Sequence, residues 1–179
     1  MSIITDAKKG DNKAFELLIE KYKLHIYKTA KSILKNEDDV CDAIQETLIS
    51  IYKNLKSLND EEYFKTWAIR ITINKCYDLI RKNDLSNKKN DIMKQKIENE
   101  ESNNNSNEIA KIDLENALIL LDDDLRLVTV MYYYDDISIK DIADILKIPK
   151  GTIKSRLSRA RKKLYKILGP EEVSNVEWE

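Results

Sequence analysis

The chain has 179 residues and a formal net charge of −1, and its 3 Gly and 2 Pro are few beside the many Lys, Glu, Asp, Ile and Leu. This composition favours helices and argues against an all-β protein, which would need more turn-forming residues. The balanced net charge excludes a chain that is basic throughout, so a nucleic-acid contact must come from a local cluster of cations.

The first part of the chain, as far as about Asn83, carries apolar residues three and four positions apart, which is the spacing of amphipathic helices. Asn59 and Asp60 predict a turn that also supplies an N-cap for the helix after it. Helices are predicted over residues 37–55 and 61–82, after an earlier helix whose apolar stripe includes Phe15, Leu18, Tyr22, Ile26, Ala30 and Ile33.

The helix predicted at 37–55 has a polar face opposite its apolar stripe. Ile49 lies in the middle of that face, where a solvated helix more often carries Lys or Glu. Either Ile49 is an isolated surface residue, which is common, or the face is an acidic docking patch with an apolar centre. The face consists of Asp42, Gln45, Glu46, Ile49 and Lys53.

The helix predicted at 61–82 alternates aromatic rings with Arg and Asn along one side. Rings stack on unpaired bases, guanidinium groups pair with phosphates, and amides read base edges, so this stripe suits opened DNA. Trp67 and Tyr77 could instead be core residues packed under a neighbouring helix. The stripe consists of Tyr63, Trp67, Arg70, Asn74, Tyr77 and Arg81.

Helical periodicity stops in an Asn-rich stretch and returns after it. The stretch cannot bury enough apolar surface to offset its ordering entropy, which predicts a flexible linker. Its 22 residues could extend over roughly 75 Å. We therefore expect an all-α fold of two small helical domains, with boundaries at 1–85, 86–107 for the linker, 108–168, and 169–179 for an acidic tail.

The sequence from Ser138 predicts a helix-turn-helix. Ser138 can cap the first helix, small Ala143 allows a close crossing, Ile148 fills the turn, and Pro149 begins the second helix. Lys147 occupies the turn position where Gly would adopt a positive φ most cheaply, at an expected cost of around 1 kcal/mol.

The second of these helices lies in a segment between Asp144 and Glu171 that contains no acidic residue and many cations. Its apolar stripe is Ile153, Leu157, Ala160 and Leu164. The opposite side has short polar residues near its start and cations further along, as a recognition helix requires. A solvated basic helix is the alternative. The outward residues are Ser155, Arg159, Lys162 and Lys166, and they are flanked by Lys154, Arg156 and Lys163.

Together these motifs resemble the extracytoplasmic-function branch of bacterial sigma-70 factors. Residues 36–48 (NEDDVCDAIQETL) are similar to the region 2 helix that docks on the polymerase clamp, and residues 63–74 (YFKTWAIRITIN) to the promoter-melting and −10 segment. The motifs DIADIL and GTIKSRLSRARKKL, within 141–164, look like region 4, which reads the −35 element.

The resemblance implies a role for each face. Asp39, Asp42, Gln45 and Glu46 would meet the polymerase clamp, with Ile49 beside them. Trp67, Arg70, Asn74 and Arg81 would hold the opened −10 strand, flanked by Tyr63 and Tyr77. The −35 major groove would be read by Lys154, Ser155, Arg156, Ser158, Arg159 and Lys162. The implied partners are core RNA polymerase, promoter DNA and an anti-sigma factor.

No catalysis, cofactor or metal is expected, because His25 is the only histidine and no nucleophile–base pair is evident. Asp122 to Asp124 predict a helix N-terminus rather than a metal site. Cys41 and Cys76 form no metal or disulfide motif. The sequence shows no signal peptide and no apolar run long enough to span a membrane, so we expect a cytoplasmic protein with no direct membrane insertion.

Two other classes stay open. One is a self-sufficient helix-turn-helix regulator that binds duplex DNA as a dimer, which a footprint of two palindromic half-sites would favour. The other is an enzyme that acts on nucleic acid, such as a nuclease, which metal-dependent cleavage of DNA would favour.

Overall fold

The computed structural model describes residues 2–91 and 114–168, and within these residues every regular element is a helix. The predicted all-α class is therefore confirmed. Side chains are described for 2–85, 114 and 116–168. The elements of residues 2–91, called the N-terminal unit, are α1 (Ile3–Lys8), α2 (Asn12–Ile33), α3 (Glu37–Asn54), the 3-10 helices η1 (Leu55–Ser57) and η2 (Glu61–Tyr63), and α4 (Phe64–Asp91).

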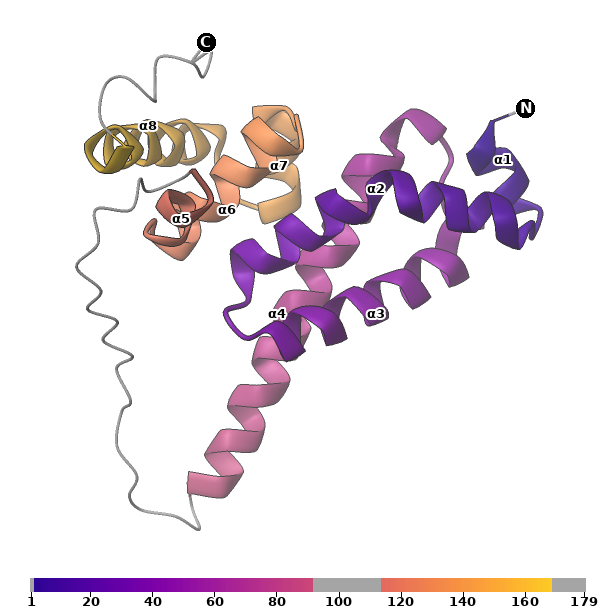
Figure 1. Cartoon of the computed structure of the whole chain (residues 1–179), viewed down its shortest axis with the longest axis horizontal. Helices are drawn as coiled ribbons and strands as arrows, with labels where there is room; N and C mark the ends of the chain where they lie inside the picture. Colours follow the sequence, from indigo (N-terminus) through magenta and orange to yellow (C-terminus); the bar gives the residue numbers. More distant parts are fainter. Residues whose placement is uncertain (1, 92–113, 169–179) are drawn as a thin grey trace.

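The C-terminal unit, residues 114–168, is built from shorter helices that precede one long helix. The elements are α5 (Leu114–Ile119), α6 (Asp123–Thr129), the π-helix η3 (Val130–Tyr134), α7 (Ile139–Leu146) and α8 (Lys150–Leu168). Figure 1 shows them beside one end of the α2 and α4 pair.

Side-chain caps fix where the helices of the N-terminal unit begin. Asp11 caps α2 by accepting hydrogen bonds from two backbone N–H groups, and Asn36 caps α3, whose first turn is acidic. Asp60 accepts from the N–H of Glu62, which confirms the predicted capping turn. The core between α2, α3 and α4 is centred on Leu18 and Phe64, both 0% exposed.

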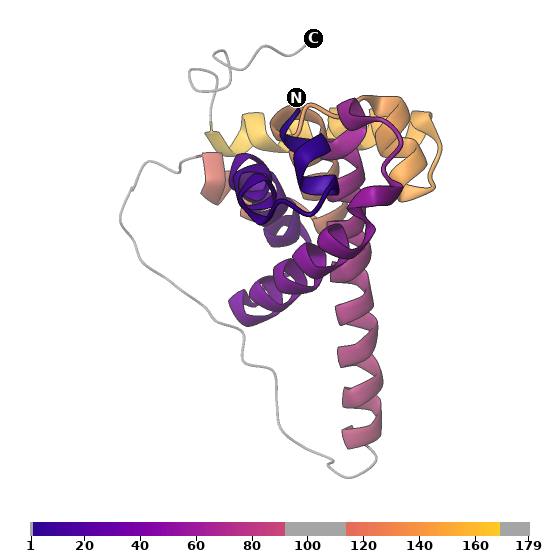
Figure 2. The ribbon, with the colours of Figure 1, turned by 90° about the vertical axis from the view of Figure 1, so that its right-hand side faces the viewer.

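Helix α4 is longer than the sequence suggested. The first domain was expected to end at residue 85, yet the helix continues to Asp91 without a break. No Gly or Pro interrupts the sequence between Phe64 and Asp91, so nothing stops helix propagation there. Figure 2 shows this end of α4 projecting away from the other helices. The rest of the expected linker, and the tail from 169, lie outside the described residues.

The helix-turn-helix forms as predicted. Ser138 caps α7 by accepting from the N–H of Asp141 at 3.1 Å, and Lys147 adopts the left-handed conformation, with φ 56° and ψ 42°. Pro149 sits one position before α8, and its carbonyl accepts the first two hydrogen bonds of that helix. The predicted apolar stripe of α8 is buried throughout.

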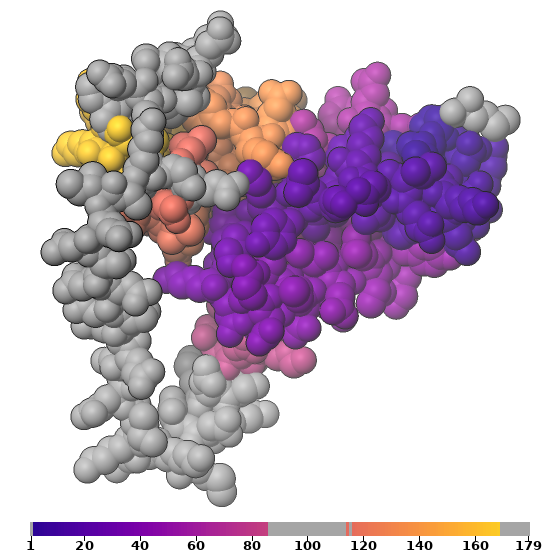
Figure 3. Space-filling model, viewed as in Figure 1, coloured from indigo at the N-terminus to yellow at the C-terminus, as the bar shows by residue number. Residues whose placement is uncertain are grey.

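The two units pack against each other, which periodicity did not predict. Ile33 of α2 and Ile69 and Ile73 of α4 join a cluster with Val128 and Met131 of the C-terminal unit. Helix α2 lies along α6 and η3, and the space-filling view shows no gap between the units at this contact (Figure 3).

Replacing Lys147 with Gly should stabilise the protein, because Gly adopts the left-handed conformation without the steric cost that a Cβ imposes. We expect the free energy of unfolding to rise by up to about 1 kcal/mol in chemical denaturation, after the greater chain entropy of Gly is subtracted. Lys166→Gly, in the last turns of α8, is the matched control and should destabilise by a similar amount. A fall in stability for both variants would contradict the strain at position 147.

The two cysteines should differ strongly in reactivity. Cys41 is exposed on α3, whereas Cys76 is buried in α4, where desolvation raises the pKa of its thiol to about 12. Since the thiolate is the reactive form, titration with a thiol reagent at pH 8 should find one fast thiol per folded chain and two in denaturant. Two fast thiols in the folded chain would contradict the burial of Cys76.

Candidate nucleic-acid and protein interfaces

The outward side of α8 presents cations together with short polar residues. This surface, here called the basic face, consists of Lys154, Ser155, Ser158, Arg159 and Lys162. Its charged members are exposed, and Ser158 is half-buried. Among the described residues no carboxylate lies within ion-pair distance of Lys154, Arg159 or Lys162. Arg159 donates from Nε to the carbonyl oxygen of Ser155 at 3.4 Å, a long bond that leaves most of the guanidinium available.

Arg156 departs from this pattern. Its guanidinium pairs with Asp124 in the first turn of α6, and its side chain is only 20% exposed. On the same side of α8, Lys163 pairs with Asp122 at 2.6 Å. Arg156 was predicted to flank the outward side, and the structure places it there, between the basic face and α6.

The three aspartates at the start of α6 form the helix N-terminus that was predicted. Asp122 is the N-cap residue, Asp123 begins the helix, and Asp123 pairs with Arg126 at 2.6 Å. With the pairs to Arg156 and Lys163, all three carboxylates are occupied by cations. No cluster of three or more metal-binding side chains occurs in the described ranges.

The predicted stripe lies on α4 and, at Tyr63, on the last residue of η2; this surface, here called the ring face, keeps most of its predicted residues in solvent. Tyr63, Arg70, Asn74, Tyr77 and Arg81 are exposed, and Arg81 pairs with Asp78. From Tyr63 to Arg81 the helix rises about 27 Å, at about 1.5 Å per residue.

Trp67 and Tyr77, for which a core role was the alternative, occupy the edges of the ring face. Trp67 is half-buried and packs on Phe64 with ring centroids 5.9 Å apart, so it belongs to both the core and the face. Desolvation raises the pKa of the Tyr77 hydroxyl, and the carboxylate of Asp124 raises it further.

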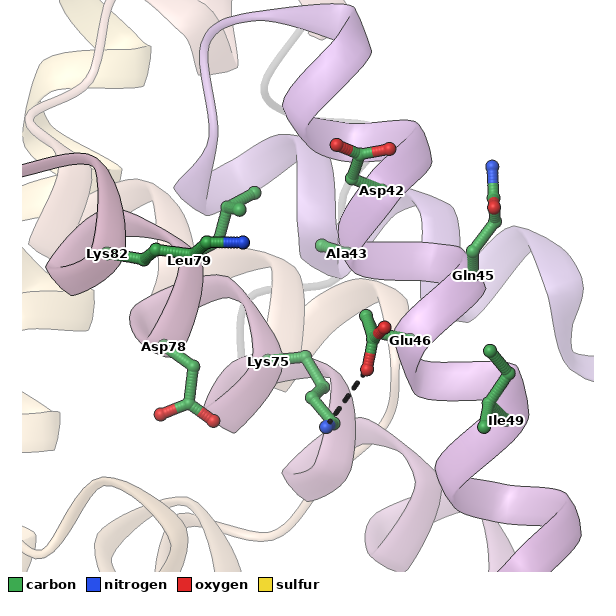
Figure 4. A pocket seen from close by; sticks show the side chains of 9 residues that line it. All are labelled: Asp42, Ala43, Gln45, Glu46, Ile49, Lys75, Asp78, Leu79 and Lys82. Atoms are coloured by element: carbon green, nitrogen blue, oxygen red, sulfur yellow. Dashed lines mark hydrogen bonds and ion pairs between the residues drawn. The ribbon is translucent and has the colours of Figure 1, made fainter. Parts of the chain in front are cut away.

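A groove of about 490 Å³ runs between α3 and α4. From α3 it is lined by the predicted Asp42, Gln45, Glu46 and Ile49. The wall from α4 was not predicted, because Lys75, Asp78 and Lys82 lie far away in sequence. Figure 4 shows Glu46 pointing across the groove to Lys75, at 3.4 Å.

Ile49 and Asp39 also belong to the polar face of α3. Ile49 is 46% exposed and lines the groove, which fits both an isolated surface residue and the apolar part of a docking patch. Asp39 lies one turn before Asp42, is half-buried, and accepts a hydrogen bond from Asn83 Nδ2 at 3.4 Å. This hydrogen bond links the start of α3 to α4.

Comparison with known proteins gives two family matches. The model for Sigma-70 region 2 matches residues 18–85, and the model for Sigma-70, region 4 matches residues 111–164. Together they cover the ring face, the groove and the basic face.

Full-length relatives agree with these matches. The ECF RNA polymerase sigma factor SigW of Bacillus subtilis (strain 168) is 33% identical, over 92% of this chain and 94% of its own. The ECF RNA polymerase sigma-E factor of Escherichia coli (strain K12) is 30% identical, over 89% of this chain and 88% of its own. In the solved complex of the sigma factor RpoE with the anti-sigma factor NepR from Bartonella quintana, the matched chain has a TM-score of 0.68 and 25% identity, covering 89% of this chain and 99% of that one.

Proposed function

This chain belongs to the extracytoplasmic-function (ECF) sigma factors of the sigma-70 family, and from that premise we propose which of its surfaces carries each step of promoter recognition. As a member of that family it is a transcription initiation factor that binds core RNA polymerase and promoter DNA. The resemblance drawn from its motifs is thereby confirmed. Region 2 and region 4 match in one chain, which favours this function over a stand-alone dimeric regulator.

The basic face of α8 is the surface that we assign to the duplex −35 element. The single observation that carries this assignment is a row of cations that no carboxylate of the described residues pairs with, beside short polar residues on the second helix of a helix-turn-helix. Such a helix fits the major groove, where its first turns reach base edges. The residues proposed are Lys154, Ser155, Ser158, Arg159 and Lys162, with Arg156 joining them once released from Asp124.

The ring face of α4 is assigned to the opened −10 strand. Exposed rings next to guanidinium and amide groups supply stacking, phosphate pairing and edge recognition along one helix. Trp67 would stack with the ring surface that its packing on Phe64 leaves open. The residues proposed are Tyr63, Trp67, Arg70, Asn74, Tyr77 and Arg81.

The groove between α3 and α4 and its acidic rim are assigned to the polymerase. A polar rim around an exposed apolar residue is the usual composition of a protein interface. The residues proposed are Asp39, Asp42, Gln45, Glu46 and Ile49. In domain terms, residues 1–85 would dock and hold the −10 strand, 108–168 would read the −35 element, and 86–107 would join them.

An anti-sigma factor is the expected regulator of this protein, by analogy with RpoE of Bartonella quintana, whose solved complex contains NepR. No helix among the described residues is long and apolar enough to cross a membrane. We place the action of this protein in the cytoplasm, where it meets RNA polymerase.

Run-off transcription with purified core polymerase and a randomised promoter library tests the proposed function. We expect new transcripts only when the full chain is added, starting downstream of one shared pair of sequence elements. Core polymerase alone and core with an unrelated helical protein are the controls. If polymerase with the chain starts no transcripts that the controls lack, the function is wrong.

A further inference from the structure

Helix α1 contacts the segment of chain that leads into the ring face. This segment, residues 58–63, follows η1, contains η2 and ends at the first residue of the ring face, and it is here called the η2 segment. Thr5 Oγ1 donates a hydrogen bond to Oε1 of Glu61 at 2.7 Å. Lys8 Nζ donates to the carbonyl oxygen of Leu58 at 2.6 Å. Two side chains of α1 therefore hold the η2 segment at two points.

Apolar packing supports these polar contacts. Ile4 and Ala7 of α1 are buried in one cluster with Leu55 and Leu58. Helix α1 is itself fixed on α2, because Gly10, with a φ of 96°, turns the chain back at the end of α1. Figure 1 shows α1 at the end of the molecule away from α8. Changes in α1 should therefore act on the ring face and leave the basic face as it is.

The contacts of Glu61 keep its carboxyl group ionised at neutral pH. Hydrogen bonds from Ser2 and Thr5 lower the pKa of Glu61, and the positive charge of Lys8 lowers it further. Hydrogen bonds to an ionised carboxylate are stronger than those between neutral groups. The first residues of the chain thus supply three polar side chains that favour one position of the η2 segment.

The other side of the η2 segment faces solvent. Asn59, Glu62 and Tyr63 are exposed, whereas the next residue, Phe64, is completely buried. Trp67 packs on Phe64 with ring centroids 5.9 Å apart. Since Phe64 and Trp67 are fixed by the core, the position of Tyr63 relative to Trp67 depends on the η2 segment that precedes it.

We propose that Thr5 and Lys8 are positioning residues for the −10 strand, because they hold the η2 segment where Tyr63 can stack on opened bases together with Trp67. This role rests on the proposed function of the ring face. A segment that already has its bound position loses less conformational entropy when the strand binds. The apparent affinity therefore falls in proportion to the fraction of molecules in which the segment has moved. Neither positioning residue needs to touch DNA.

Two substitutions remove the contacts one at a time. Thr5→Val deletes the hydroxyl and Lys8→Met deletes the ammonium, and both keep the apolar part of the side chain. Thr5→Ser keeps the hydroxyl and should behave as the parent does. Lys9→Met is the matched control, because Lys9 is exposed and pairs with Asp6 inside α1 at 3.7 Å.

Hydrogen exchange in the full chain measures whether α1 holds the η2 segment. The backbone N–H groups of Leu58, Glu62 and Tyr63 donate hydrogen bonds to nearby acceptors, so their exchange reports local opening. We expect Thr5→Val and Lys8→Met each to speed this exchange about fivefold, as the loss of one hydrogen bond allows. Parent-like exchange in both variants would overturn the proposal.

Fluorescence anisotropy with the holoenzyme measures the consequence for the −10 strand. The probe is a labelled single strand that carries the −10 sequence found by run-off transcription, and a scrambled strand is the reference. Thr5→Val and Lys8→Met should each weaken binding about fivefold. The affinities for −35 duplex DNA and for core polymerase should stay unchanged, which also verifies that both variants are folded.

A salt titration separates positioning from direct contact with DNA. If Lys8 acts only through the η2 segment, Lys8→Met leaves the slope of log affinity against log salt concentration unchanged. Loss of a phosphate contact on a single strand would instead make this slope shallower by about 0.7. A shallower slope would therefore make Lys8 a DNA contact and overturn its positioning role.

The outcomes distinguish this role from the proposed function. A parent holoenzyme that binds the −10 strand no better than the scrambled strand overturns the ring-face assignment, and the positioning role with it. A parent that prefers the −10 strand, with equal affinity in Thr5→Val and Lys8→Met, overturns the positioning role alone. Fivefold losses in both variants, with parent-like binding in Thr5→Ser and Lys9→Met, support it.

Discussion

Arg159→Ala is expected to abolish most promoter-directed transcription while leaving the affinity for core polymerase unchanged. Arg159 is exposed on the basic face of α8, and no carboxylate of the described residues competes for its guanidinium. A guanidinium that binds a guanine edge or a phosphate contributes about 1–3 kcal/mol, so we expect a loss of about 5- to 150-fold in affinity for −35 duplex DNA. Fluorescence anisotropy with the holoenzyme measures this affinity, and a pull-down measures the affinity for core.

Two comparisons sharpen this prediction. Lys35→Ala, an exposed cation between α2 and α3, is the charge control and should leave duplex affinity within twofold. Arg156→Ala should have a smaller effect than Arg159→Ala, because Arg156 must first leave Asp124. Equal losses of DNA and polymerase binding in Arg159→Ala would mean that the variant is misfolded or the assignment is wrong.

Glu46→Lys is expected to weaken binding to core polymerase about tenfold, mainly through slower association at low salt. Glu46 lies in the groove between α3 and α4, with Lys75 as its partner across it. Reversing its charge removes an acidic group from the proposed docking rim and sets two ammonium groups against each other. Surface plasmon resonance with immobilised core polymerase gives both rate constants.

A charge exchange separates docking from local stability. In Glu46→Lys/Lys75→Glu the ion pair across the groove is restored, but the acidic group has moved from α3 to α4. If Glu46 contacts polymerase, the double variant should remain weak. Recovery of full affinity would show that the pair only stabilises the groove. Glu16→Lys, exposed on α2, controls for the change in net charge.

Much of the fold followed from local patterns. The stripe of α8 is buried as its period indicated, because Ile153 and Leu157 lie one turn apart on one side. Lys147 takes the left-handed conformation that its turn position required, and Ser138 and Asp60 cap helices as their side chains allow. These features depend on neighbours within a few residues, which is the range that sequence patterns cover.

The features that sequence reasoning missed depend on contacts between distant residues. His25 and Asp135 are 110 positions apart, and nothing in either neighbourhood indicates the other. Lys75 completes the groove only because α4 lies beside α3. Asp136 has a φ of 52°, although the sequence around it shows no turn motif that would predict this left-handed backbone conformation. Most of the proposed site residues are exposed, whereas Asp39, Trp67, Arg156 and Ser158 are half-buried, and the individual contacts of all of them with polymerase and DNA stay predictions.

The added length of α4 has a consequence for promoter architecture. The six residues 86–91, counted as part of an extensible linker, belong to a helix that advances about 1.5 Å per residue instead of about 3.3 Å. A rod of this kind bends little, so it shortens the maximum reach between the two units by about 10 Å. The protein should therefore tolerate long spacers between promoter elements less well than a fully extensible tether would allow, and a series of templates that differ by single base pairs would reveal that limit as a sharp upper bound.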